Sequence, residues 1–288
     1  MRTRQTANGS NHTRLAATTW IRGPLFVLLC GFAPLACGDE GQDNAAEPDS
    51  ATPPNSNANP DPSPNPNPSP NANPNPNPIA SGSRILPLGD SITEGVPHHY
   101  RFALSQRLQT AGVSFDFVGS VNSDAANYGT GWDQDHEGHD GWGTVDVIAE
   151  LPTWLNGYDA DVALVHLGTN DVLAVAANEF TWADSIGNLG AIIDALRQDN
   201  PAIQIYLAQI LPMLEEGTPD PGVAEWNQRV ATLAGQRTTA ASPITVVDMN
   251  TGFGAGDLEG DGIHPNQAGG EKMAGVWATA LLAGLGAQ

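Results

Sequence analysis

The sequence predicts an α/β domain built on a mostly parallel sheet. Short apolar runs alternate with longer helix-like stretches from residue 83 to the C-terminus. That span holds roughly 205 residues, enough for one domain with a good core. Strands that alternate with helices pack into a parallel sheet that helices cover on both faces. The predicted strands are 84–88, 115–118, 162–167, 203–210 and 244–247, and the predicted helices lie near 99–111, 145–155, 182–198, 223–237 and 267–285.

The first 37 residues have the pattern of a secretory signal. A basic segment without Asp or Glu, residues 1–22, precedes an apolar run that ends at Cys37. The run is too short to span a bilayer as a stable helix. Small or apolar residues before the cysteine are typical of bacterial lipoproteins, although Pro34 stands where leucine is usual. We expect export to the cell envelope or the extracellular space, with membrane attachment through lipidated Cys37; simple secretion and a retained anchor are the alternatives.

Cysteine content and charge limit the chemistry and the partners. Both cysteines, Cys30 and Cys37, lie in the predicted signal, so the domain has no internal disulfide and no cysteine nucleophile. Removal of the signal leaves 7 basic and 32 acidic residues, a net charge of −25. Such a surface repels nucleic acid and anionic membranes and favours neutral substrates, although it also fits plain solubility outside the cell.

Residues 38–82 are predicted to be a disordered linker, followed by the globular domain at 83–288. Between Pro48 and Pro78, 12 of 31 residues are proline and 9 are asparagine, a composition that cannot bury a core. Within the domain, 120–143 is the one long irregular stretch. A loop of that length in a compact domain is usually functional or disordered.

The stretch Gly-Asp-Ser-Ile-Thr-Glu-Gly follows the first predicted strand and contains Ser91. Gly89 permits a turn there, because glycine tolerates backbone angles that a Cβ forbids. The carboxyl ends of strands are where α/β sheets bind their ligands. Ser91 is therefore a candidate nucleophile, and an ordinary turn serine is the alternative.

A serine nucleophile needs a base, a group that orients the base, and donors for an oxyanion. The spacing of Asp261 and His264 can bring the carboxylate to the imidazole, although a capping aspartate beside a surface histidine would look the same. Asn170 follows the strand 162–167, which places its amide at the sheet edge of Ser91; a turn asparagine is the alternative. The backbone N–H groups of Gly141 and Ser91 are further candidate donors.

Together these residues resemble the SGNH, or GDSL-type, hydrolases. Gly-Asp-Ser-Ile-Thr around Ser91 matches the first block of that family, and Gly141 matches the glycine of the second. Asn170 in Gly-Thr-Asn-Asp matches the third block, and Asp261 with His264 matches the last. The resemblance implies a three-layer α/β/α, flavodoxin-like fold with a mostly parallel five-stranded sheet. It implies Ser91 as nucleophile, His264 as base, Asp261 as the group that orients it, and Gly141 and Asn170 as oxyanion donors.

A narrower resemblance concerns the substrate. His-Glu-Gly-His-Asp-Gly-Trp at 136–142, with 117–120 upstream and 261–266 downstream, looks like the carbohydrate esterase family 3 branch. This resemblance implies an acetyl xylan esterase that acts on acetylated polysaccharide or small esters. We expect no cofactor. Asp140 stands where a small residue is expected, which leaves the fine specificity open.

Candidate substrate contacts lie beside these blocks, and other roles compete for the same residues. Trp132 and Trp142 are placed to stack on a sugar ring, and packing explains either equally well. His136 and His139 are alternative metal ligands, but His-Glu-x-His is not the spacing that puts two imidazoles on one helix face, and we expect no metal. His166, within a buried strand, is expected to be a hydrogen-bonded core histidine. The predicted substrate contacts are Asp90, His139, Trp142 and Trp132.

Two other functions remain open from the sequence. An SGNH lipase, lysophospholipase or thioesterase would need an apolar groove, which the acidic, Trp-containing stretch 120–143 does not resemble. A noncatalytic carbohydrate-binding relative would bind sugar without turnover, and the intact set of Ser91, Asn170, Asp261 and His264 argues against it. We expect the domain to be monomeric and to have no nucleic-acid partner.

Overall fold

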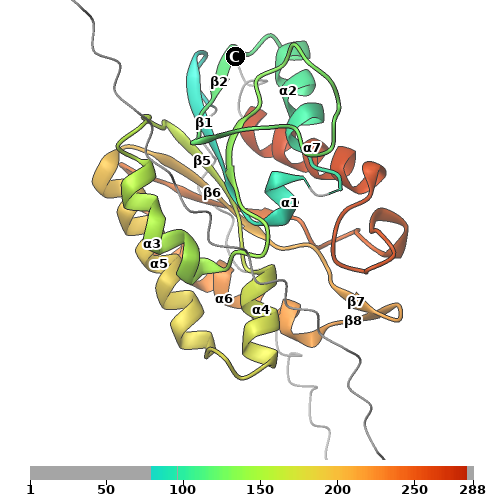
Figure 1. Cartoon of the computed structure of the whole chain (residues 1–288). Helices are drawn as coiled ribbons and strands as arrows, with labels where there is room; N and C mark the ends of the chain where they lie inside the picture. The colour runs from blue at the N-terminus through green and yellow to red at the C-terminus, as the bar shows by residue number, and fades with distance from the viewer. Residues whose placement is uncertain (1–78, 96, 284–288) are drawn as a thin grey trace, which may run out of the picture. The chain divides into compact units, whose positions relative to one another are not determined.

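The computed structural model of the chain describes residues 79–95 and 97–283 (Figure 1). The predicted signal, the proposed lipidation site Cys37 and most of the predicted linker lie outside the described residues. Ile79 already packs into the core, a few residues before the predicted start of the domain. Its side chain is buried, and its N–H donates to the carbonyl of Leu281 at 3.4 Å.

A seven-stranded sheet forms the centre of the domain and contains all five predicted strands. Two short strands were not predicted, and a separate two-stranded hairpin also forms. The sheet strands are β1 (Ser83–Gly89), β2 (Phe115–Phe117), β3 (Val121–Asn122), β4 (Asp135–Gly138), β5 (Val162–His166), β6 (Gln204–Gln209) and β9 (Ile244–Asp248); the hairpin is β7 (Leu214–Glu215) with β8 (Thr218–Pro219).

The strand order confirms the predicted flavodoxin-like fold class. β2 and β4 pair with the two ends of one edge of β1, while β5, β6 and β9 follow from its other edge. All these pairs are parallel, whereas β3 pairs antiparallel with β4 at the edge of the same sheet. Successive strands are therefore added on one side of β1 and then, from β5 onward, on the other. The point between β1 and β5 where the strand order reverses is where open α/β sheets bind ligands. Gly89 at the end of β1 lies opposite Gly138 of β4 and His166 of β5.

Helices cover both faces of the sheet, which completes three layers (Figure 1). Strand side chains alternate between the two cores: Ile85 packs into one, and Leu86 and Leu88 pack into the other. None of the helices that the structure describes is long and apolar enough to cross a membrane. One layer holds α1 (Ser91–Glu94), α2 (Arg101–Thr110) and α7 (Gln267–Leu282); the other holds α3 (Thr144–Trp154), α4 (Thr169–Ala176), α5 (Trp182–Asp199) and α6 (Pro221–Arg237).

The stretch 120–143, predicted to be one irregular loop, contains both short strands. β4 carries mostly polar residues, and their partners lie inside the protein, so no apolar run marks the strand. His136 illustrates this: its Nδ1 accepts the Gly138 N–H at 2.8 Å, and its Nε2 lies 3.1 Å from the Ser123 hydroxyl. Because Nδ1 accepts, Nε2 carries the proton of the ring. Burial lowers the pKa of His136 to about 2, so the ring is neutral.

His166 is fully buried at the end of β5, as expected for a core histidine. The expectation that it is hydrogen-bonded was wrong, because neither ring nitrogen has a partner among the residues described. Burial lowers the pKa of His166 to about 4, which keeps the ring neutral at physiological pH.

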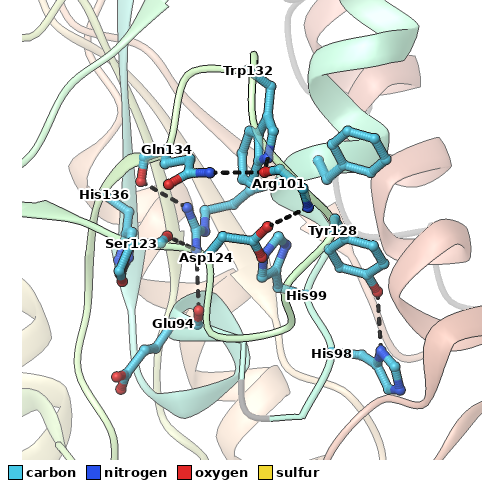
Figure 2. Close-up of polar contacts among 12 residues, drawn as sticks. Glu94, His98, His99, Arg101, Ser123, Asp124, Tyr128, Trp132, Gln134 and His136 are labelled. Carbon is cyan, nitrogen blue, oxygen red and sulfur yellow. Dashed lines mark hydrogen bonds and ion pairs between the residues drawn. The ribbon is translucent and has the colours of Figure 1, made fainter.

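Arg101, a fully buried cation, organises the stretch around β4 (Figure 2). Its Nε donates to the carbonyl of Thr93 at 2.9 Å, and its Nη1 donates to the carbonyl of Gln134 at 2.9 Å. Its Nη2 donates to the carbonyls of Glu94 and Ser123 at 3.0 and 3.1 Å. Burial lowers the pKa of Arg101 to about 10, so it is still a cation at neutral pH. One side chain thus joins the end of α1 to two separate loop segments.

Asp90 is the N-cap of α1, and its predicted contact with substrate was wrong. Its side chain is completely buried, and its Oδ1 accepts the N–H of Ile92 at 3.0 Å. Burial raises the pKa of Asp90 to about 7, against the opposing effect of the Ile92 hydrogen bond. An aspartate at the start of a helix satisfies an N–H that would otherwise lack a partner. That role points the carboxylate inward, away from anything that binds at the surface.

We expect Arg101→Met to lower the free energy of unfolding by about 3 kcal/mol or more, because four carbonyls that are buried or half-buried lose a charged donor. Arg107→Met on the same helix is the control. Arg107 is exposed and, among the residues described, its side chain donates to the carbonyl of Glu271 at 3.4 Å, so the change should stay within about 0.5 kcal/mol. Urea unfolding measures both. Equal midpoints for the two variants would show that the buried cation does not organise this region.

We expect Asp90→Asn to remove a pH dependence of stability. A carboxyl whose pKa is about 7 when folded, against about 3.9 when unfolded, favours the folded state at low pH and loses that contribution as pH rises towards 7. The slope is roughly 1.4 kcal/mol per pH unit in that window. Asparagine keeps the cap without the charge. The free energy of unfolding of the variant, measured in urea, should therefore rise relative to that of the wild type between pH 5 and 7. Parallel pH profiles would contradict the prediction.

Candidate active site

Ser91, His264 and Asp261 lie in one hydrogen-bonded row at the carboxyl edge of the sheet. Ser91 is the first residue of α1, and its Oγ is 2.8 Å from Nε2 of His264. Nδ1 of His264 is 2.7 Å from Oδ2 of Asp261. His264 and Asp261 are partly exposed, whereas Ser91 is largely buried. The structure therefore brings together three residues that the sequence places at the two ends of the domain.

The turn that carries His264 is folded around the Asp261 carboxylate. Oδ1 of Asp261 accepts the N–H groups of Ile263 and His264 at 2.9 and 3.0 Å, which leaves Oδ2 for the imidazole. Partial burial raises the pKa of Asp261, but the hydrogen bonds from Ile263 and His264 outweigh burial and hold the pKa below its ordinary value. Asp261 is thus held as a carboxylate that fixes the imidazole through its Nδ1 side.

The hairpin β7–β8 supports this turn from behind. The N–H of Leu214 donates to the carbonyl of Gly262 at 2.8 Å. Gly262 has a φ of +71°, and a Cβ there would meet the carbonyl oxygen of Leu214 at 2.1 Å. Only glycine fits both the backbone angle and the close contact. A hairpin distant in sequence therefore sets the position of the Asp261 and His264 turn.

The three candidate oxyanion donors follow the ends of neighbouring strands β1, β4 and β5. Ser91 begins the helix after β1. Gly141 is exposed beyond the end of β4, with a φ of +76° and nothing within 4 Å of the place a Cβ would take. Asn170 is the second residue of α4, and its Nδ2 donates to the carbonyl of Trp142 at 2.8 Å. An amide nitrogen has two protons, so one donor remains for a ligand.

His139 and Trp142 lie on either side of Gly141 in sequence and stack on each other. Their ring centroids are 4.5 Å apart, and Trp154 of α3 stacks on His139 at the same distance. Nε2 of His139 lies 2.9 Å from the carboxylate of Glu137, which is fully buried. His139, Trp142 and Trp154 all keep some exposure, so this stack stays accessible beside Gly141.

Trp132 lies in a different cluster and does not join the other predicted substrate contacts (Figure 2). Its ring packs against His99 and Phe102 at 5.6 and 5.5 Å and lies 5.5 Å from the Arg101 guanidinium. Its Nε1 donates to the carbonyl of Gly129 at 3.1 Å. These contacts favour the packing role for Trp132 that the sequence left open.

The His-Glu-x-His residues that suggested an alternative metal site are bound to protein groups instead. His136 bonds to Ser123 and Gly138, and His139 bonds to Glu137. Across residues 79–95 and 97–283, no group of three or more His, Cys, Asp or Glu side chains is arranged to hold a metal ion.

Two carboxylates that the sequence analysis did not single out hold the segment around Gly141. Oδ2 of Asp171 accepts the Thr144 N–H at 3.0 Å, and its Oδ1 accepts the Thr144 hydroxyl at 2.5 Å. Oε2 of Glu94 accepts the N–H of Asp140 at 2.7 Å. Both stand inside motifs already noted, next to Asn170 and three residues after Ser91. That proximity in sequence was the only signal available.

Comparison with known proteins agrees with this fold. The model of the GDSL-like lipase/acylhydrolase family matches residues 88–272. The solved structure of a carbohydrate esterase family 3 protein from Talaromyces cellulolyticus is 30% identical, with a TM-score of 0.62 over 69% of this chain and 96% of that one. The structure of an acetyl esterase mutant with an acetate ion has the same identity, TM-score and coverage.

A curated relative shows the same likeness over part of its length. A multidomain esterase from Ruminococcus flavefaciens is 29% identical over 223 residues, which make up 67% of this chain and 28% of that protein. The chain therefore spans only about a quarter of that relative. The likeness covers most of the described domain here. This chain belongs to the GDSL-like lipase/acylhydrolase family, and its matched domain is a carboxylic ester hydrolase domain similar to that of carbohydrate esterase family 3.

Proposed function

We propose that the protein is an exported serine esterase that removes acetyl groups from polysaccharide, in the manner of an acetyl xylan esterase. The row from Ser91 through His264 to Asp261, with distances of 2.8 and 2.7 Å, is the observation that carries the proposal. The similar structures named as a carbohydrate esterase and as an acetyl esterase with an acetate ion support the substrate class. Export, with attachment through Cys37, rests on the sequence pattern alone.

The first half-reaction transfers the acetyl group to the enzyme. Nε2 of His264 takes the proton of Ser91 as Oγ forms a bond to the acetyl carbonyl carbon. The carbonyl oxygen becomes an oxyanion, and the bond from carbon to the sugar oxygen then breaks. The imidazolium gives its proton to that sugar oxygen, which leaves as a hydroxyl. Asp261, held ionised, stabilises the imidazolium and keeps Nδ1 protonated.

The second half-reaction releases acetate. Water gives a proton to His264 and attacks the acetyl-Ser91 ester. The new tetrahedral oxyanion occupies the same place as the first. Its collapse breaks the bond from carbon to Oγ, and His264 returns the proton to Oγ, so acetate leaves and the free serine is restored. Both half-reactions use the same imidazole, and only the complete cycle returns the chain to its starting state.

The oxyanion is stabilised by donors that are fixed before the reaction. The N–H groups of Ser91 and Gly141 and the amide of Asn170 come from the ends of three adjacent strands, so the sheet sets their spacing. Fixed donors need no reorganisation when charge develops, which makes such sites effective. Apart from its chain neighbours, no protein atom lies within 4 Å of the place a Cβ of Gly141 would take, so the surface beside this turn is open.

We expect the full-length protein to release acetate from acetylated xylan, and Ser91→Ala to lower kcat by about 10³-fold or more. Asp261→Asn should lower kcat by about 10²–10⁴-fold, because it no longer holds the correct imidazole tautomer. Asp116→Asn, an exposed carboxylate on β2, is the control and should keep wild-type activity.

Two other outcomes would change the proposal. Ser91-dependent cleavage of a small acetyl ester, without release from xylan, would keep the esterase and remove the polysaccharide assignment. Sugar binding that survives Ser91→Ala, with no turnover by the wild type on either substrate, would contradict the serine esterase and favour the noncatalytic carbohydrate-binding relative.

We expect acetyl esters to be cleaved roughly 100-fold faster than decanoyl esters, which separates this enzyme from a lipase or thioesterase of the same family. The carboxylates of Glu94, three residues after Ser91, and of exposed Asp140, next to Gly141, disfavour the binding of a long apolar acyl chain there. Steady-state rates on 4-nitrophenyl esters of increasing chain length test this. A rate that rises with chain length would assign the protein to the lipases.

A further inference from the structure

The segment from Gly138 to Thr144, here called the oxyanion loop, is tied to its surroundings on two sides. On the β1 side, the N–H of His139 donates to the carbonyl of Gly89 at 3.2 Å. On the α4 side, Asn170 binds the carbonyl of Trp142, and Asp171 binds Thr144. Gly141 lies between these attachments, so its N–H direction depends on how firmly both sides hold.

Gly141 occupies the third position of a tight turn. The N–H of Trp142 donates to the carbonyl of His139 at 3.2 Å, and Gly141 has a φ of +76°. A positive φ at the third residue is the pattern of a type II turn. The peptide between Asp140 and Gly141 is the central one of such a turn, and types I and II differ by a flip of that peptide. The flip would reverse the Gly141 N–H, so whatever holds Asp140 helps to keep the donor in place.

Glu94 provides that hold from the helix that begins with Ser91. It is the last residue of α1, and its Oε2 accepts the N–H of Asp140 at 2.7 Å. This is a side-chain hydrogen bond between α1 itself and the oxyanion loop. The serine and the loop are therefore joined through one carboxylate.

The backbone of Glu94 is fixed independently of its side chain. Its carbonyl accepts from the buried guanidinium of Arg101 at 3.0 Å, and Figure 2 shows its carboxylate pointing away from Arg101. At Gly138, a Cβ would lie 2.2 Å from the backbone nitrogen of Glu94, so the loop begins in direct contact with α1. A fixed backbone lets the carboxylate act as a rigid clamp on Asp140.

We propose that Glu94 is a positioning residue that sets the Gly141 N–H relative to the Ser91 oxygen. It touches neither substrate nor the reacting atoms and acts through the turn at Asp140. The inference rests on the proposed serine esterase function. It adds that the carboxylate three residues after the nucleophile contributes to kcat.

The test compares Glu94→Ala and Glu94→Gln in the full-length protein on a small acetyl ester. Alanine removes the acceptor for the Asp140 N–H, so kcat should fall roughly 10- to 100-fold, with KM within about 2-fold. Glutamine keeps a carbonyl acceptor and should retain kcat within about 5-fold. Glu225→Ala, at a half-exposed glutamate of α6 that pairs with Arg229, is the matched control and should match wild type.

Two further measurements separate positioning from folding. Thermal unfolding of Glu94→Ala should match the control variant, and a methylphosphonate that mimics the oxyanion should react with Ser91 more slowly by the same factor as kcat. Unchanged kcat in Glu94→Ala, or a loss that follows thermal stability, would overturn the inference while the esterase function stands. Absence of any Ser91-dependent cleavage by the wild type would instead count against the proposed function.

Discussion

The close approach of three backbones at the end of β1 is the constraint on which the rest of the site depends. A Cβ at Gly89 would lie 2.3 Å from the carbonyl oxygen of His166 on β5, and one at Gly138 would lie 2.2 Å from the nitrogen of Glu94. The ends of β1, β4 and β5 can therefore converge without side chains between them. Because Ser91, Gly141 and Asn170 follow directly from these three strand ends, glycine at two positions determines how closely the candidate nucleophile and donors gather.

Charge inside the domain complements this packing. The chain carries a net charge of −21, yet one of its few arginines, Arg101, is fully buried and bonded only to carbonyl oxygens. Burying a cation is costly unless its donors are satisfied, and Arg101 uses four of them. The buried carboxylate of Glu137 likewise has hydrogen-bond partners, which are Ser120, His139 and Tyr158. Loops that lack regular structure are held by such buried charges where a sheet or helix would otherwise supply backbone hydrogen bonds.

Much of the fold was predictable because the main strands are covered on both faces and appear as apolar runs. β4 was not predictable, since its residues are polar and find their partners inside the protein. The helix α1 has only four residues, too few to show a helical period. At the site, motif spacing indicated which residues meet, but not which way they point: Asp90, adjacent to Ser91, turns inward as a cap, and Trp132 packs against Arg101.

The shortness of α1 has a further consequence for the serine it carries. An isolated helix of one turn is not stable in water, so its geometry must come from its contacts. Asp90 caps its start, and Gly95 ends it in a left-handed conformation with an N–H that donates to the carbonyl of Ser91 at 2.7 Å. Arg101 then binds the carbonyls of Thr93 and Glu94. Ser91 therefore owes its position to contacts at both ends of one helical turn. A rigid turn of this kind can present an oxygen to His264 and an N–H to an oxyanion at the same time.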